Sequence, residues 1–282
     1  MSVKMIQDRL ESYRCRSATE EEQALREITQ EVVLAALGRT DFFKKAAFQG
    51  GTCLRIFYGT NRFSEDLDFA LREMEPSFAL GPYLGILAKD LEAYGCDLEV
   101  EDRTKLDQMV RKAFLKDESL GRLLRLKYKP TTGPLRKMRI KLEVDVNPPP
   151  GAIFEIKYLD FPFPSAVCLF DPPSLFAGKL HALLCRGYLK GRDWYDFIWY
   201  TSRRTPANYA LLSSALEQNG PWKGRHVAAD RDWCVEHLRR RVDEMDWRQA
   251  AEDVRRFLKP GELPSLELWG KDLFLAQCEK LR

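Results

Sequence analysis

Hydrophobic and polar positions follow two different periods along this chain, and the pattern changes near Pro172. In the first part, helical patterns with apolar residues three and four apart mix with short apolar or alternating segments typical of strands. The helical patterns cover 23–38 and 83–94, and the strand patterns cover 47–48, 66–71, 96–100, 123–128, 138–146 and 166–170. After Pro172 nearly every pattern is helical. These helices are expected at 174–186, 193–202, 208–218, 230–242, 247–258 and 266–281.

This change of period predicts two domains. We expect residues 1–171 to form an α/β (α+β) domain with N-terminal helices and a small mixed sheet, and residues 172–282 to form an α-helical domain. Three prolines and a glycine at 148–151 follow the strand pattern at 138–146. They are expected to end that strand in a rigid turn within the first domain.

The composition changes this picture little. The 282 residues are 45% hydrophobic, enough for a substantial core, and no run approaches the about 20 apolar residues of a membrane span. The seven cysteines lie far apart without a C-x-x-C pair, so neither disulfides nor a structural zinc site are expected. We therefore expect a cytoplasmic protein without a membrane partner.

The net charge of +3 does not by itself indicate a polyanionic partner. Basic residues are nevertheless clustered, at 122–129 and at 136–141. Such local patches can bind the backbone of a nucleic acid even when the total charge is small.

The candidate chemistry lies in the strand pattern that contains Asp66 and Asp68. Side chains alternate along a strand, so these two carboxylates share one face while Leu67 and Phe69 share the other. Two such carboxylates can hold Mg²⁺ ions for in-line phosphoryl transfer. A third acid is expected from the strand pattern at 138–146, where Asp145 is a better candidate than Glu143 because it is shorter and ends the strand. Asp145 is also a candidate acceptor for a hydroxyl proton.

A bare Asp-x-Asp pattern is weak evidence, because Asp230-Arg231-Asp232 is a second one in this chain. The second pattern is interpreted as the acidic start of a helix. The first pattern differs because Gly50-Gly51-Thr52 precedes it by about 14 residues. A glycine pair allows close approach of the backbone, and a helix that begins there offers free N–H groups to a phosphate.

Two blocks of the sequence resemble the AbiEii/AbiGii toxin family of nucleotidyltransferases, within the polymerase-beta-like superfamily. The first block runs from Gln49-Gly-Gly-Thr-Cys-Leu-Arg through Tyr58 to Arg62-Phe-Ser-Glu-Asp-Leu-Asp-Phe69. The second consists of Asp171-Pro-Pro-Ser-Leu-Phe-Ala-Gly-Lys179-Leu-His-Ala-Leu-Leu-Cys-Arg186 and Arg192-Asp193-Trp-Tyr-Asp196-Phe. Together they span about half of the chain in the expected order, and they are more specific together than apart.

The resemblance implies an enzyme that transfers NMP from an NTP, with ATP or CTP as the nucleotide, to an acceptor hydroxyl, and that needs Mg²⁺ or Mn²⁺. The acceptor would be the 3′ end of a tRNA or another RNA. The protein would act as a toxin of a type IV toxin–antitoxin or abortive-infection system, with a cognate antitoxin encoded nearby.

Carried onto this chain, the resemblance also implies roles for individual residues. Asp66 and Asp68 would hold the metal ions. The nucleotide contacts would be Gln49, Gly50, Gly51, Thr52, Arg62, Ser64, Lys179 and Asp193. Lys179 would neutralise phosphate charge, and Asp193 or Asp196 would complete the second motif. Many relatives have lysine where this chain has Gln49, which could change triphosphate binding.

Other interpretations stay open at this stage. An antibiotic-type nucleotidyltransferase that modifies small molecules, or one that modifies proteins, would share the metal site without needing a basic acceptor surface. A non-enzymatic interaction protein with a decayed site would show no Mg²⁺-dependent binding of NTP. For Asp193 and Asp196 a structural role, with helix capping and pairing to Lys190 or Arg192, is as consistent with the pattern as a catalytic one.

Overall fold

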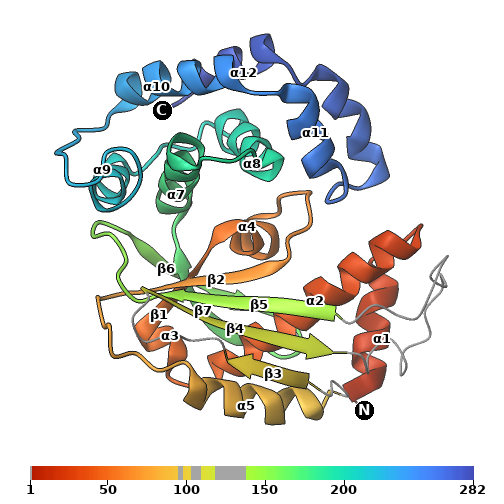
Figure 1. The fold of residues 1–282 in the computed structure, drawn as a ribbon. Coiled ribbons are helices and arrows are strands. Elements are labelled where there is room, and N and C mark those ends of the chain that lie inside the picture. The colour runs from red at the N-terminus through yellow and green to blue at the C-terminus, as the bar shows by residue number, and fades with distance from the viewer. Residues whose placement is uncertain (1, 95–97, 103–108, 118–137) are drawn as a thin grey trace. The chain divides into compact units, whose positions relative to one another are not determined.

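A computed structural model of the chain describes residues 2–94, 98–102, 109–117 and 138–282 (Figure 1). The chain divides into two compact units. The first unit comprises Met1–Phe57, Phe63–Pro148 and Ile156–Leu169. The second comprises Tyr58–Arg62, Pro149–Glu155 and Phe170–Arg282. Two short segments that precede residue 171, 58–62 and 149–155, thus belong to the second unit.

A mixed seven-stranded sheet organises the first part of the chain, in the order β3-β4-β5-β2-β1-β7-β6. Its strands are β1 (Ala46–Gln49), β2 (Asp66–Leu71), β3 (Leu98–Asp102), β4 (Val110–Asp117), β5 (Met138–Asp145), β6 (Phe154–Leu159) and β7 (Ser165–Phe170). Strand β2 lies between β1, with which it pairs antiparallel, and β5, with which it pairs parallel. The predicted α/β domain with a mixed sheet is therefore confirmed.

The first unit also contains five helices among the described residues. They are α1 (Ser2–Ser12), α2 (Ala18–Gly38), α3 (Phe42–Lys45), α4 (Gly50–Tyr58) and α5 (Gly81–Glu92). Helix α2 packs against α5 and β5, and α5 packs against β3. The alternation of β2 and β5 fits this arrangement, because Leu67, Phe69, Leu142 and Val144 are all buried.

The second unit contains helices α7 (Pro172–Cys185), α8 (Gly191–Ser202), α9 (Tyr209–Gln218), α10 (Arg231–Glu244), α11 (Trp247–Arg255) and α12 (Lys271–Cys278), with the 3₁₀ helix η1 (Pro260–Leu268). Four of these helices begin at a capping side chain that accepts a backbone N–H: Asp171, Asn208, Asp230 and Asp246. Such caps satisfy N–H groups that have no partner within the helix. Asp230 therefore has the structural role that was predicted for the second Asp-x-Asp pattern.

Aromatic side chains form the core around α8. Trp194 and Tyr200 are almost fully buried. The ring of Trp194 packs edge-on against Trp247 and Phe274, at centroid distances of 4.9 and 5.2 Å. Tyr200 stacks on Phe176 at 4.5 Å. The helical spacing of aromatic residues in α8 thus reflects packing within the second unit.

Several elements differ from the sequence-based prediction. The helix expected at 266–281 is broken, because η1 ends at Leu268 and the backbone is extended at Gly270, a residue that favours helices poorly. Helix α1 and strands β4 and β6 were not predicted. The strand predicted at 123–128 lies outside the described residues.

Two expectations drawn from composition can be compared with the structure. The six cysteines that the structure describes, Cys15, Cys53, Cys168, Cys185, Cys234 and Cys278, are all free thiols. Within the described residues, no helix combines the length and the apolar character needed to cross a membrane.

Candidate active site

The two aspartates of the first motif lie on strand β2. Asp66 and Asp68 are partly exposed, whereas Leu67 and Phe69, which alternate with them, are at most 1% exposed. The period of two therefore leaves both carboxylates on the open face of the sheet, as predicted. The neighbouring strands β1 and β5 determine which residues lie beside these two aspartates.

Strand β1 brings the glycine turn to this carboxylate pair. Gln49, the last residue of β1, is the register partner of Asp68, so the turn that follows begins beside this aspartate. Gly50 has φ +79°, and a Cβ built on it would lie 2.5 Å from Oδ2 of Asp68. Both the backbone conformation and the lack of space require glycine at this position.

Helix α4 begins within this turn, at Gly50, as the sequence predicts. Thr52 is completely buried, and its hydroxyl donates a hydrogen bond to the backbone carbonyl of Asp66. This bond ties the first turn of α4 to the start of β2. The free N–H groups of a helix N-terminus thus lie next to two carboxylates, an arrangement that suits a metal-bound phosphate.

The register of β5 determines which acid faces Asp68. Glu143 is the register partner of Asp68. Asp145, the predicted third acid, is the register partner of Ala70, two residues further along β2. Asp145 accepts a hydrogen bond from the backbone N–H of Asn147 at 2.9 Å, and burial raises its pKa. Glu143 forms ion pairs with Lys141 at 2.6 Å and Lys112 at 3.2 Å.

That Asp66, Asp68 and Asp145 together bind a metal ion stays a prediction. Among the residues that the structure describes, no three His, Cys, Asp or Glu side chains are grouped closely enough to hold a metal ion. Asp66 and Asp68 share a face and can supply oxygen ligands from one strand. The structure adds Glu143 as an acid at the level of Asp68, a position that only strand register reveals.

Cationic and aromatic side chains extend the same sheet face across β5 and β4. Lys112 and Phe114 on β4 are register partners of Glu143 and Lys141, so they point to the same side as the aspartates. The guanidinium of Arg139 lies 3.8 Å from the ring centre of Phe114. The sequence offers no separate signal for Lys112 or Phe114, because strand β4 was not predicted.

The residues of the second motif form a buried ionic cluster within the second unit. The Lys179 ammonium on α7 lies 2.8 Å from Asp193 and 2.9 Å from Asp196, both on α8. Arg62 donates two hydrogen bonds to Asp196, at 2.6 and 2.5 Å, and Arg186 pairs with Asp193. Three cations and two carboxylates therefore meet here, with Asp196 and Arg62 almost completely buried.

Electrostatics keep this cluster ionised. Burial alone would raise the pKa of Asp193, but the charges of Lys179 and Arg186 outweigh it and lower the pKa to about 2. Asp196 also has a lowered pKa, because Arg62 and Lys179 outweigh its desolvation. The same carboxylates raise the pKa of Lys179 despite its burial.

The cluster modifies two sequence-based expectations. Asp193 forms ion pairs with Lys179 and Arg186, and Asp196 forms them with Lys179 and Arg62, which lies 134 residues away in sequence. The charge of Lys190 also lowers the pKa of Asp193. Neither caps α8, since Lys190 occupies the N-cap position. Lys179 has two carboxylate partners, so any phosphate would compete with them for its charge.

Of the remaining predicted nucleotide contacts, Ser64 lies on the loop that leads into β2, where its backbone carbonyl accepts a hydrogen bond from Gln30 at 3.2 Å. Arg62 has its side chain in the ionic cluster described above. The structure therefore divides the predicted site residues into two groups, one in each unit. Gln49, Gly50, Gly51, Thr52, Ser64, Asp66, Asp68 and Asp145 belong to the first unit, and Arg62, Lys179, Asp193 and Asp196 to the second.

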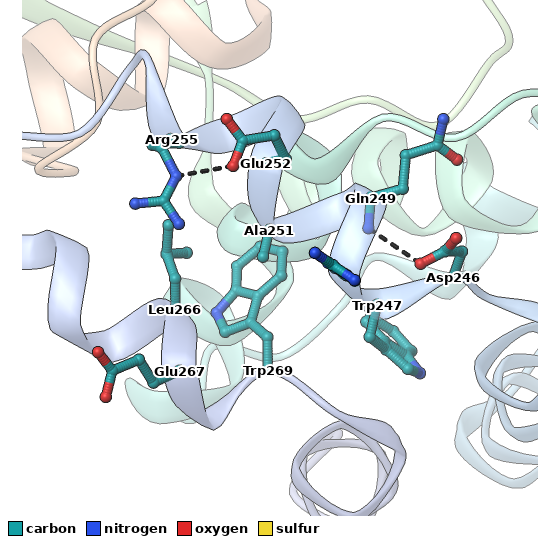
Figure 2. A pocket seen from close by; sticks show the side chains of 10 residues that line it. Asp246, Trp247, Gln249, Ala251, Glu252, Arg255, Leu266, Glu267 and Trp269 are labelled. Atoms are coloured by element: carbon teal, nitrogen blue, oxygen red, sulfur yellow. Dashed lines mark hydrogen bonds and ion pairs between the residues drawn. The ribbon is translucent and has the colours of Figure 1, made fainter.

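A cavity of about 860 Å³ lies elsewhere in the second unit, between α11 and η1 (Figure 2). Trp247 and Trp269 line it, and Arg255 pairs there with Glu252 at 2.8 Å. The other lining residues are Asp246, Arg248, Gln249, Ala251, Leu266 and Glu267. None of the predicted site residues lines this cavity, so its volume does not locate the active site.

A glycine turn that opens a helix, followed by an Asp-x-Asp strand in a mixed sheet, defines a nucleotidyltransferase. The comparison with protein families agrees: residues 32–276 match the family described as nucleotidyl transferase AbiEii toxin, type IV toxin–antitoxin system. The chain therefore belongs to the AbiEii family of nucleotidyltransferase toxins. The family implies an NTP substrate and an antitoxin partner.

Solved structures share the fold. MenT4, the nucleotidyltransferase toxin Rv2826c from Mycobacterium tuberculosis H37Rv, is 16% identical with a TM-score of 0.54, covering 100% of this chain and 91% of its own. JHP933 from Helicobacter pylori is 18% identical with a TM-score of 0.50, covering 92% and 94%. A putative nucleotidyltransferase from H. pylori is 16% identical with a TM-score of 0.50, covering 91% and 96%. No curated protein sequence matches the chain significantly.

Proposed function

We propose that this nucleotidyltransferase transfers NMP from an NTP to a hydroxyl group of RNA, with tRNA as the expected acceptor, and thereby acts as a toxin. The observation that carries the proposal is the contact between the glycine turn and the carboxylate pair. Gly50 lies directly against Asp68, and Thr52 is hydrogen-bonded to the backbone of Asp66. A triphosphate bound at the start of α4 would thus lie beside both aspartates.

The residues present fit a divalent cation such as Mg²⁺ or Mn²⁺, because carboxylate oxygens are the ligands that these ions prefer. Asp66 and Asp68 would hold it, with Asp145 as the proposed third acid. The bound ion would stabilise negative charge on the attacking and leaving oxygens. The backbone N–H groups at Gly51 and Thr52 would orient the phosphates through the helix N-terminus.

The reaction would be an in-line displacement at the α-phosphorus. The oxygen of the acceptor hydroxyl forms a bond to the α-phosphorus, the bond from that phosphorus to the bridging oxygen breaks, and pyrophosphate leaves with the electron pair. The hydroxyl proton would pass to Asp145. Burial raises the pKa of this carboxyl, which makes it a better proton acceptor than an exposed aspartate.

A polyanionic acceptor is favoured by the sheet face beside the aspartates. Lys112, Arg139 and Lys141 lie on β4 and β5 on the same side as Asp66 and Asp68. Glu143 forms ion pairs with Lys112 and Lys141. Phe114 adds an aromatic ring covered by a guanidinium. Cations interleaved with an aromatic side chain are typical of surfaces that bind single-stranded nucleic acid.

The test is transfer of label from α-³²P NTPs to total RNA in the presence of Mg²⁺. We expect labelled RNA with the unmodified protein and at least about 100-fold less with Asp66→Ala or Asp68→Ala, because each change removes a metal ligand. Asp232→Ala is the matched control, since Asp232 belongs to the second Asp-x-Asp pattern and is highly exposed on α10. Full activity of both β2 variants, or label found only in small molecules, would refute the proposal.

A further inference from the structure

Helix α2 buries an unusual number of polar side chains for a core helix. Six of them are less than 9% exposed: Glu21, Gln23, Glu27, Thr29, Gln30 and Glu31. A buried carboxylate or amide is costly unless it is paired or hydrogen-bonded. The partners of these side chains therefore show what the helix holds in place.

Glu27 has hydrogen-bond partners on helix α4 and on the segment that follows α1. Its Oε2 accepts a hydrogen bond from Nε of Arg55 at 2.7 Å, and its Oε1 accepts one from the hydroxyl of Tyr13 at 2.9 Å. The side chains of Arg55 and Glu27 are only 12% and 11% exposed. An ion pair this well shielded from water is held far more rigidly than one on the surface.

Arg55 connects Glu27 to the glycine turn. It lies on α4, three residues after Thr52 and therefore about one helical turn along the same face. Its guanidinium also lies 4.6 Å from the ring centre of Phe63, on the loop that leads into β2. A single side chain thus fixes both α4 and the segment before the aspartates against α2.

Two further side chains of α2 hold the next residues of the same loop. Gln30 donates to the carbonyl of Ser64 at 3.2 Å, and Arg26 lies 3.5 Å from Glu65. With Arg55 on Phe63, each residue from 63 to 65 has a contact to α2 or to the arginine that α2 anchors. The next residue in the chain is Asp66.

Three side chains of this network lie ahead of the segment that matches the family. The match begins at residue 32, whereas Tyr13, Glu27 and Gln30 precede it. Helix α1 is joined to the same network, because Arg9 pairs with Glu31 at 2.5 Å and Tyr13 reaches Glu27. The N-terminal helices therefore supply contacts to the site that the family pattern does not include.

We propose that Glu27 is a positioning residue for the nucleotide site, acting through Arg55 on the glycine turn, so that α1 and α2 set the geometry between that turn and the aspartates. This inference rests on the proposed function. Glu27 does not need to touch the nucleotide. Without the contact between Glu27 and Arg55, the N–H groups of the turn would no longer be held beside Asp68, and binding of the triphosphate would weaken.

The first test needs no substrate. In hydrogen–deuterium exchange of the free protein, Glu27→Gln should increase exchange of amides in 50–58 and 63–66 while leaving β5 unchanged. Arg39→Met is the control, because it removes an arginine ion pair between the end of α2 and Asp90 of α5, outside this network. Equal exchange of 50–58 in Glu27→Gln and the unmodified protein would overturn the proposal.

The second test uses the transfer assay. Glu27→Gln should raise the KM for NTP by about tenfold while kcat stays within about twofold, because uniform binding is lost. Arg55→Met should have the same effect, and the double variant should be no worse than either single one, since both changes remove one interaction. Glu27→Asp should recover part of the loss.

The outcomes separate this inference from the proposed function. Additive effects of Glu27→Gln and Arg55→Met, or a KM change of equal size in Arg39→Met, would overturn the positioning role even if transfer occurs. If the unmodified protein transfers no nucleotide, the proposed function fails. The exchange result then still decides whether Glu27 holds α4 in place.

Discussion

Gly50 offers the sharpest single test of the site, because two independent features of the structure forbid a side chain there. Its φ of +79° costs a non-glycine residue about 1–2 kcal/mol. A Cβ would also lie 2.5 Å from Oδ2 of Asp68 and 3.1 Å from its Cβ. Gly50→Ala must therefore strain the backbone and displace the carboxylate of Asp68 at the same time.

Gly59 separates the two effects. Its φ is +73°, nearly that of Gly50, but a Cβ built there would meet no atom within 4 Å. Gly59→Ala thus carries the backbone cost without the displacement. At about 2–4 °C per kcal/mol for a chain of this size, this backbone cost alone should lower the Tm of either variant by about 2–8 °C.

Activity should distinguish the pair where stability does not. We expect Gly50→Ala to lower nucleotide transfer by at least about 100-fold, because a misplaced metal ligand lies at the reacting phosphate. Gly59→Ala should retain transfer within about twofold at a temperature well below its Tm. The reasoning is refuted if Gly50→Ala keeps full transfer, or if both variants lose it equally while folded by circular dichroism.

Further predictions concern the ionic cluster, the acceptor surface and the metal. Arg62→Met should destabilise the protein by about 3–5 kcal/mol in urea unfolding, since it leaves the fully buried Asp196 without its bidentate partner. Asp193 has a folded pKa of about 2, below its unfolded value of about 3.9, so the stability that it contributes is present above pH 4 and is lost as the pH falls toward 2. In Asp193→Asn, the unfolding free energy should fall less steeply as the pH is lowered toward 2. Lys112→Ala with Lys141→Ala should raise the KM for RNA several-fold and reduce its salt dependence. Chelation with EDTA should abolish transfer, and excess Mg²⁺ should restore it.

Each of these predictions has a control. Arg255→Met removes an arginine from a half-exposed pair with Glu252 and should change the unfolding free energy little. If Asp193→Asn and the unmodified protein lose the same unfolding free energy as the pH falls toward 2, the role assigned to Asp193 is contradicted. The double lysine variant should leave the KM for NTP nearly unchanged; a parallel rise would indicate that these lysines bind the nucleotide instead. Transfer that survives EDTA would contradict a metal-dependent mechanism.

The sequence was most informative where a local period or a local backbone constraint decides the structure. Strand β2 has the bounds predicted for it, Asp66–Leu71, because alternation of buried and polar residues is itself the signal of a half-buried strand. The helix after the glycine pair and the cap at Asp230 were also predicted, since both depend on residues within one turn. The helix across Gly270 was predicted wrongly, because its apolar period continues through a residue that breaks it.

Contacts between distant segments could not be read in the same way. Strand β6 was not predicted, and its Ile156 and Tyr158 are 67% and 73% exposed, so its pattern carries no sign of a core. One of the two interpretations left open for Asp193 and Asp196 paired them with the sequence neighbours Lys190 or Arg192. The structure pairs Asp196 with Arg62, which lies 134 residues away.

The sequence by itself determined the family and the residue types of the site, because the glycine turn and the Asp-x-Asp strand are short motifs whose geometry follows from their own backbone. Tertiary structure decided which side chains stand around them. Only strand register places Glu143 beside Asp68, and only the packing of α2 brings Glu27 to Arg55. The physical reason is that local backbone preference fixes a strand or a turn, whereas burial of charge is resolved by whichever partner the fold brings within reach.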